Sequence, residues 1–179
     1  MMWTIRRAES GDGLRLRSLR LQALTDAPEA FLETYDQAVA LEPGEWESRI
    51  ERSRQPGHQL LVVGEAGGIW LGMAGAFVDC DRDSADLTIP VGPQDRWAML
   101  WGMYAVPTVR GQGLAAELCT EARKWAAIEA RVSWLGLDVR DSNARAIRFY
   151  RREGFEVVAR REHRELGVTS LVMVQPVAI

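Results

Sequence analysis

The segment from Trp97 to Ala115 constrains the fold of this chain more than any other part of the sequence. An apolar run, residues 97–106, leads into the glycine-containing stretch Pro107–Ala115, and a helical pattern of apolar residues follows. Glycines at such a strand-to-helix junction let the backbone approach a ligand closely, and the first helical N–H groups, from about Gly111 onward, are free to bind an anion. The junction therefore predicts a site for a phosphate or pyrophosphate.

The residues around the glycines narrow the choice of nucleotide ligand. No Gly-Lys-Ser or Gly-Lys-Thr follows them, so the lysine and hydroxyl group of a P-loop are missing. The stretch Gly111–Ala116 also fits the dinucleotide fingerprint, with Asp138 on the following strand as a candidate ribose-binding acid. Two observations argue against a dinucleotide-binding fold. Residues 107–110 separate the strand from the glycines, and too few residues follow Asp138 for a second mononucleotide-binding half. The sequence favours a nucleotide-containing cofactor, with a dinucleotide-dependent oxidoreductase as the less favoured alternative.

Two motifs resemble those of the GNAT superfamily of N-acetyltransferases. The stretch Arg110–Ala115 matches the acetyl-CoA signature Arg/Gln-x-x-Gly-x-Gly/Ala, and Asn143–Tyr150, followed by Gly154 and Phe155, is similar to the segment Asn-x-x-Ala-x-x-x-Tyr. The resemblance is good over residues 97–158 and least informative at residues 20–55 and 79–96. It implies a mixed α/β, GNAT-like fold with roughly four helices and a central mixed, twisted sheet of about seven strands. In such a fold the strands at residues 97–106 and 134–139 splay apart.

The resemblance also implies which residues bind acetyl-CoA, the acyl donor. They lie at the end of the central strand, in the glycine junction and in the second motif: Met103, Tyr104, Ala105, Val106, Arg110, Gly111, Gln112, Gly113, Leu114, Ala115, Asn143, Ala146 and Tyr150. A backbone N–H within residues 103–105 would polarise the thioester carbonyl. Tyr150 is the implied catalytic residue, a general acid for the departing CoA thiolate. Its ordinary pKa near 10 exceeds that of a thiol, near 8.5, so this transfer is mildly uphill.

The implied activity is acetyl-CoA-dependent N-acetylation without a metal. The primary amine of a small molecule or peptide would attack the thioester directly in a ternary complex. A noncatalytic acyl-CoA sensor on the same fold is the alternative. An ammonium group is almost fully protonated at neutral pH, so attack needs a proton acceptor. Candidates are Glu33 and the aspartates of residues 79–95. Candidate walls of the acceptor pocket are Phe31, Tyr35, Trp46, Trp101 and Met103.

Composition excludes several other functions. A net charge of -3 gives no reason to expect nucleic acid or an anionic membrane as a partner. Two cysteines and two histidines support neither a disulfide framework nor a zinc site. We expect one domain over residues 1–179, a cytoplasmic location, a bacterial source and a monomer or homodimer. The acidic residues at 79–95, together with Glu29 and Glu33, favour a cationic amine as the acceptor.

Periodicity and turn residues predict the order of the elements. The expected strands are residues 3–8, 59–63, 69–78, 97–106, 134–139, 155–158 and 168–174, and the expected helices include residues 11–26 and 45–54. A third helix follows the glycine junction. For the fourth helix, Asp141 or Ser142 is the expected N-cap, and Gly154 suits the position after its last turn.

Overall fold

The computed structural model describes residues 2–79, 96–164 and 167–177, and its strands form a seven-stranded mixed sheet in the order β1-β2-β3-β4-β5-β7-β6. The strands are β1 (Thr4–Arg7), β2 (Gln59–Ala66), β3 (Ile69–Asp79), β4 (Trp97–Ala105), β5 (Trp134–Arg140), β6 (Glu156–His163) and β7 (Val168–Pro176). The helices are α1 (Gly13–Asp26), α2 (Tyr35–Val39), α3 (Pro43–Ser53), α4 (Leu114–Ile128) and α5 (Ala144–Arg152), with short 3-10 turns at Pro28–Ala30 (η1) and Pro107–Val109 (η3). This architecture confirms the predicted fold class.

Two details differ from the sequence-based expectation. The short helix α2 was not predicted, and a capping box between Thr34 and Gln37 supports it. The N-cap of α5 is Asn143, whose Oδ1 accepts the N–H of Ala146 at 3.0 Å, so the prediction of Asp141 or Ser142 as cap was wrong. All three side chains are typical caps, and the choice depends on where the backbone leaves β5.

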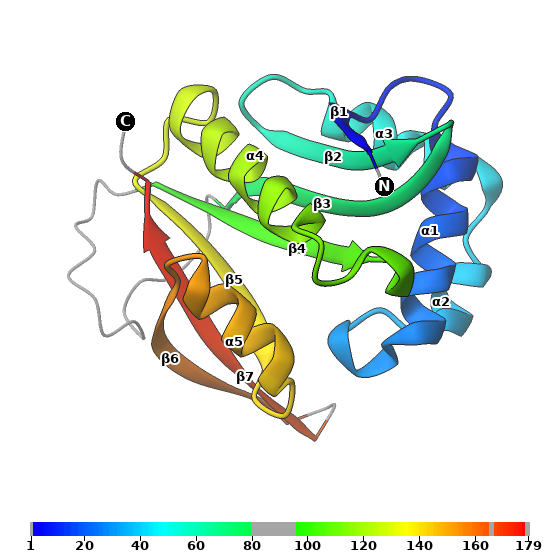
Figure 1. Cartoon of the computed structure of the whole chain (residues 1–179). Helices are drawn as coiled ribbons and strands as arrows, with labels where there is room; N and C mark the ends of the chain where they lie inside the picture. The colour runs from blue at the N-terminus through cyan, green and yellow to red at the C-terminus, as the bar shows by residue number, and fades with distance from the viewer. Residues whose placement is uncertain (1, 80–95, 165–166, 178–179) are drawn as a thin grey trace.

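Helices cover both faces of the sheet (Figure 1). Leu60 and Val62 of β2 line a groove with Trp125 of α4, whereas Gln59 of β2 lies against Arg49 of α3 on the other face. Helix α1 packs with α3, and α5 lies beside α4 over the β5–β7 half of the sheet (Figure 1). The two halves of the sheet therefore meet between β4 and β5, with α4 and α5 on one side and α1 on the other.

The junction between β4 and β5 is open along most of its length. These two strands are parallel, but only three pairs join them, and the last is Met99 with Gly136. Beyond these pairs, β4 continues to Ala105 and β5 to Arg140. The backbone groups that face this opening lack the partners that neighbouring strands normally supply. The predicted splay is thus present in the structure.

A β-bulge in β4 accompanies the opening. Gly75 of β3 pairs with Trp101 and Met73 pairs with Tyr104, so two residues of β4 stand opposite one residue of β3. Gly102, inside the bulge, has a φ of +64°, which favours glycine. Bulges bend a strand and increase its local twist. This bulge therefore turns the end of β4 away from β5 just after their pairing stops.

Candidate active site

The N-terminus of α4 is an open cradle of backbone groups. Gly111 and Gly113 have φ values of +77° and +101°, both in the left-handed region that favours glycine. The first helical bond runs from the N–H of Glu117 to the carbonyl of Gly113, at 3.1 Å, so the N–H groups of residues 114–116 precede it and have no acceptor inside the helix. A Cβ atom at Gly111 would meet no atom of the described residues within 4 Å, its chain neighbours aside. The geometry fits an anionic group such as a pyrophosphate.

Close packing holds this cradle in place. The side chain of Leu114 lies over Gly64 of β2, where a Cβ atom would approach Leu114 Cδ1 to 2.3 Å. Only glycine at this position lets the first turn of α4 approach the sheet so closely. The cradle therefore has a fixed position relative to the end of β4.

The side chain of Arg110 has partners within the protein. Its Nε donates to the carbonyl of Ala105 at 2.9 Å, and its Nη2 forms an ion pair with Asp26 at the end of α1. Its guanidinium carbon lies 5.6 Å from the ring centre of Tyr104, whose hydroxyl donates to the same carboxylate at 3.4 Å. In this arrangement, Arg110 supports the turn between β4 and α4, and it offers a ligand its backbone rather than its charge.

The open edge of β4 presents unpaired backbone groups. The N–H of Val106 donates to the carbonyl of Leu71 on β3 at 2.9 Å. Because backbone groups point alternately to the two sides of a regular strand, the N–H of Ala105, next to Val106, points toward β5. Met103 lies in the bulge, where this alternation is interrupted. The N–H of Ala105 can serve a ligand that enters the splay.

The second motif lies on α5, across the splay from β4. Asn143 caps the helix through Ala146, so the side chain of Asn143 has a structural role in the first turn. Tyr150 is 9% exposed and packs edge-on against Phe149 and Phe155, with ring centres 5.1 and 5.6 Å away. Its hydroxyl has no hydrogen-bond partner among the residues that the structure describes. A tyrosine hydroxyl without a protein partner is free to donate its proton to a ligand.

The surroundings of Tyr150 keep it neutral. Burial raises the pKa of its phenol far above the ordinary value, and the nearby Cys119 on α4 adds to this effect. Burial also raises the pKa of the Cys119 thiol, to about 11. Both groups therefore keep their protons at neutral pH. Cys119 is fully buried and packs as a small side chain in the core.

A cavity of about 360 Å³ lies on the face of the sheet covered by α1 and α3. Its lining comes from five elements and the loop before α2: Arg20, Glu33, Arg49, Arg52, Gln59, Phe77 and Trp101. Trp101 belongs to the part of β4 beyond the last pair with β5. The cavity thus borders the open half of β4.

Glu33 is held by two arginines in this cavity. Arg20 Nε donates to Glu33 Oε2 at 2.8 Å, and Arg49 Nη2 donates to Oε1 at 3.0 Å. Burial opposes ionisation of the carboxyl, but the hydrogen bonds and charges of Arg49 and Arg20 outweigh it, so the pKa of Glu33 is lowered. A carboxylate with a lowered pKa accepts a proton poorly. This environment disfavours Glu33 as a general base.

The other residues predicted to form the acceptor pocket or to act as the base lie in different surroundings. Trp101 lines the cavity, Phe31 stacks on Arg20 at 4.4 Å, and Met103 is half-buried on β4. Trp46 is 0% exposed, so the prediction that it lines a pocket was wrong, and it belongs to the core. Tyr35 is 46% exposed on α2. Of the aspartates at 79–95, only Asp79 lies within the described residues.

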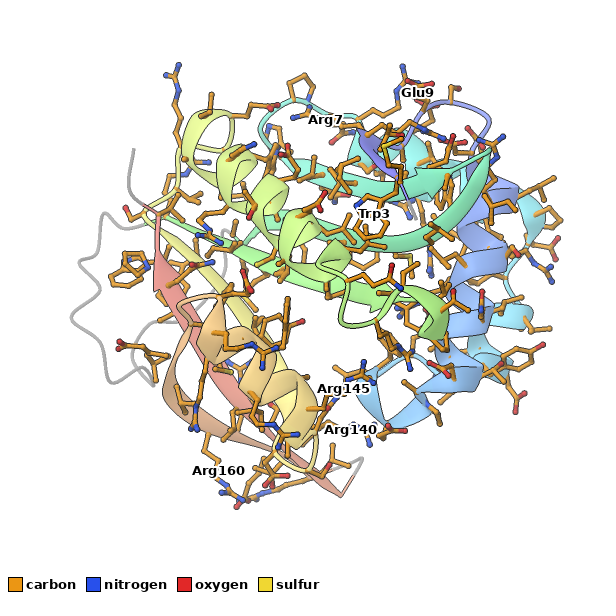
Figure 2. The ribbon with its side chains drawn as sticks, in the orientation of Figure 1. Trp3, Arg7, Glu9, Arg140, Arg145 and Arg160 are labelled. Carbon is orange, nitrogen blue, oxygen red and sulfur yellow. The ribbon has the colours of Figure 1, made fainter. Side chains whose placement is uncertain are left out.

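Two arginines near the site escaped the sequence analysis. Arg20 lies on the buried stripe of α1 with Leu16, Leu19, Ala23 and Leu24, and a charge at that position in a helical pattern could have drawn attention to it. Arg140, at the end of β5, donates to the carbonyl of Phe31 at 3.2 Å. Figure 2 shows Arg140 and Arg145 between α5 and the loop after α1. No sequence pattern relates Arg140 to Phe31, since 109 residues separate them.

Within residues 2–79, 96–164 and 167–177, no group of three or more His, Cys, Asp or Glu side chains could hold a metal ion. Over the same part of the chain, no helix is long and apolar enough to cross a membrane.

Comparisons with known proteins agree with this geometry. The sequence profile of the acetyltransferase (GNAT) family matches residues 21–155. A GNAT-family acetyltransferase from Streptococcus pneumoniae shares 19% identity with a TM-score of 0.78, covering 99% of this chain and 100% of that one. The yncA protein of Salmonella typhimurium, solved with its cofactor acetyl-CoA, shares 17% identity with a TM-score of 0.75, covering 100% and 96%.

A third structure is a ribosomal-protein-alanine N-acetyltransferase from Brucella melitensis. It shares 20% identity with a TM-score of 0.73, covering 97% of this chain and 99% of that one. At these identities, the structures establish a common fold. No curated protein matches the sequence significantly.

Proposed function

The chain belongs to the acetyltransferase (GNAT) family, and we propose that it transfers an acetyl group from acetyl-CoA to the primary amine of a small molecule or peptide. The observation that carries this proposal is the open splay between β4 and β5, which ends beside the backbone cradle of α4. A cofactor with a pyrophosphate and an extended arm would use both features at once. The acetyl-CoA that the yncA protein holds supports the same donor here.

The proposed donor site uses backbone rather than side-chain charge. The N–H groups that begin α4 would bind the pyrophosphate, with the positive end of the helix dipole behind them. Backbone groups of β4 within residues 103–105 would bind the arm in the splay. When bound, acetyl-CoA supplies a thioester that an amine can attack without a metal. Asn143 and Ala146 would border the arm through the first turn of α5.

Two groups of the chain would then assist the acyl transfer. The N–H of Met103 or Ala105 would donate to the thioester oxygen as negative charge develops there, and removal of one such donor costs about 3–4 kcal/mol in other enzymes. Tyr150 would donate its proton toward the departing sulfur. Because burial raises the pKa of Tyr150, we expect a hydrogen bond that stabilises the thiolate, with complete proton transfer only as the sulfur leaves.

The acceptor must lose a proton before it attacks. Glu33 is disfavoured as the base because two arginines already bind its carboxylate. We propose that the amine enters through the cavity beside Trp101 and loses its proton to water there. This route keeps the acceptor on the α1 and α3 face of the sheet, apart from the pyrophosphate site.

Binding and turnover assays separate this function from its alternatives. Isothermal titration with acetyl-CoA and with NADH should show binding of acetyl-CoA only, and the reverse would favour an oxidoreductase. Release of free CoA thiol should then be measured against a panel of amines. Tight acetyl-CoA binding with no turnover of any amine would leave the acyl-CoA sensor as the function.

A further inference from the structure

The cavity beside Trp101 carries more positive than negative charge. Arg20, Arg49 and Arg52 line it, together with Glu33. Outside the lining, Glu45 pairs with Arg52 at 2.7 Å and with Arg49 at 3.6 Å. Three arginines thus face two glutamates, which leaves one positive charge in excess among the described residues of this cluster. A site of this kind attracts anions and repels polyamines.

The buried arginine of this cluster has hydrogen-bonding capacity left over. The side chain of Arg20 is only 8% exposed, and Glu33 uses its Nε. Its Nη1 is buried and has no acceptor among the described residues. A guanidinium carries five N–H donors, and leaving a buried donor without a partner is unfavourable. The arrangement is therefore incomplete as it stands, and one more acceptor would complete it.

The free side of Arg20 lies toward the open part of β4. A Cβ atom built on Gly102 would lie 3.9 Å from Arg20 Nη1, and no other described atom outside residues 101–103 lies within 4 Å of it. Gly102 is in the bulge that follows the last pair between β4 and β5. A ligand held by Arg20 would thus be next to the part of the splay where the thioester is proposed to lie.

We propose that this cavity binds the carboxylate of the acceptor, so that the protein acetylates amines that carry a carboxylate, such as free amino acids. The inference rests on the proposed function for the transfer itself. Arg20 and Arg52 would hold the carboxylate in a charge-assisted hydrogen-bonded pair. The amine of the same molecule would then point toward Met103 and the splay.

The rest of the lining fits an acceptor of amino-acid size. Phe77 and Trp101 provide apolar walls for a side chain, and Gln59 offers an amide. The volume, about 360 Å³, is at the small end of the range of roughly 300–1,000 Å³ that is typical of small-molecule sites. The acidic residues of the sequence predicted a cationic acceptor, whereas the excess positive charge of this cavity favours an anionic group. Glu33 is the acidic residue that lines the cavity, and Arg20 and Arg49 already bind its carboxylate.

A comparison of matched acceptors tests the proposal. Each of several amino acids with an apolar side chain, for example phenylalanine and leucine, is assayed beside its decarboxylated amine and its α-amide. The decarboxylated amine is more basic than the amino acid and the amide is less basic, so a preference set by amine basicity would place the amino acid between them. We expect kcat/KM for the amino acid to exceed both by roughly tenfold or more, since a hydrogen bond to a charged group contributes about 1.5–3 kcal/mol.

Charge variants on α3 test which residues are responsible. Arg52→Gln should raise KM for the amino acid several-fold without changing KM for acetyl-CoA or for the decarboxylated amine. Arg54→Gln is the matched control, because Arg54 pairs with Glu51 and does not line the cavity. Glu45→Gln should act in the opposite direction and lower KM for the amino acid, because it frees Arg49 and Arg52, while Glu51→Gln should have no effect.

The buried arginine requires a conservative change. Arg20→Lys keeps the positive charge and loses the fork of donors, so we expect a roughly tenfold loss in kcat/KM for the amino acid and a much smaller loss for its amine. If Arg20→Lys does not fold, the four exposed variants on α3 and at its C-cap still decide the question.

The outcomes distinguish this inference from the proposed function. Equal kcat/KM for the amino acid, its amide and its amine would overturn the carboxylate site and leave the acetyltransferase intact. Preference for polyamines or for long peptides would also overturn it. Faster turnover with succinyl-CoA than with acetyl-CoA, and no preference among acceptors, would assign the carboxylate to the acyl group instead. Failure to acetylate any amine would refute the proposed function itself.

Discussion

Arg110 and Asp26, 84 residues apart in the sequence, form an ion pair that joins the glycine junction to the end of α1. The same guanidinium caps the carbonyl of Ala105, the last residue of β4. The arginine of the acetyl-CoA signature thus connects three parts of the fold. We infer that its side chain fixes the position of the α4 cradle relative to the end of β4.

The role of Arg110 can be separated from a direct phosphate contact. Arg110→Ala should lower the free energy of unfolding by about 1–2 kcal/mol, since it removes a half-buried ion pair and a carbonyl hydrogen bond. Asp26→Ala should cost less, and a double-mutant cycle in urea should show coupling between them. Acetyl-CoA affinity, measured by titration, should change less than tenfold in both. An unchanged stability with lost acetyl-CoA binding in Arg110→Ala alone would instead show that the guanidinium binds the cofactor.

The backbone cradle predicts unequal effects at neighbouring positions. Gly113→Val should weaken acetyl-CoA binding more than tenfold, because a side chain disfavours the left-handed backbone and obstructs the anion site, whereas Gln112→Ala should change it only about threefold or less. The control for backbone strain alone is Gly11→Val, at a φ of +91° in a remote loop, where a Cβ atom meets no described residue within 4 Å apart from its chain neighbours. Similar small losses in Gly113→Val and Gln112→Ala would mean that the pyrophosphate binds elsewhere.

Cys119 predicts a stability that declines in alkaline solution. Burial raises the pKa of its thiol from the ordinary 9.0 to about 11, so the unfolded chain loses this proton first as the pH rises. The contribution is fully present below pH 9 and decreases through pH 11, by roughly 3 kcal/mol in total, at about 1.4 kcal/mol for each unit of pKa. Urea unfolding of the wild type and of Cys119→Ala should be compared at pH 8, 9 and 10.

The difference between these two proteins is the informative quantity. Other groups that titrate in this range, such as the tyrosines of the unfolded chain, are present in both proteins. Cys119→Ala leaves a small cavity, whose cost is independent of pH. The wild type should therefore lose its advantage over the variant as the pH rises. A difference that stays constant from pH 8 to 10 would show that the thiol is less buried than the structure indicates.

The sequence was most informative where short-range pattern decides structure. The turn between the predicted strands at 59–63 and 69–78 has positive φ values at Gly67 and Gly68, a conformation that favours glycine and suits a hairpin. The first residue of every strand was predicted within one residue, because apolar runs and turn residues are local signals. Strand β6 continues to His163, five residues beyond its predicted end. The glycine junction could be recognised from the sequence for the same reason, because few residues other than glycine adopt the positive φ values found at Gly111 and Gly113.

The features that the sequence did not predict depend on distant residues. Helix α2 has five residues, too few for a periodic pattern to appear. The cavity beside Trp101 combines Arg20, Glu33 and Arg49 from three separate segments with the sheet beneath them. Which charged side chains line it is apparent only in the folded chain. The acidic residues along the sequence predicted a cationic acceptor, whereas the proposed carboxylate site rests on the arginines that line the cavity. Most of the aspartates at 79–95 lie outside the described residues, so the prediction of a cationic acceptor stays a prediction.

Tyr150 provides the last prediction, because its hydroxyl can be removed without disturbing its packing. Tyr150→Phe keeps the contacts with Phe149 and Phe155, and the hydroxyl has no partner among the described residues to lose. Thermal unfolding should therefore be nearly unchanged. We expect kcat to fall by roughly ten- to a thousandfold, within the range for a general acid, with little change in KM for acetyl-CoA.

Because burial raises its pKa, Tyr150 should stay protonated up to at least pH 10, so an alkaline decline in kcat below that pH belongs to another group. Rapid-quench measurements must first show that the acyl transfer limits turnover. Under that condition, an unchanged kcat in the stable variant would mean that water, and not Tyr150, protonates the departing sulfur.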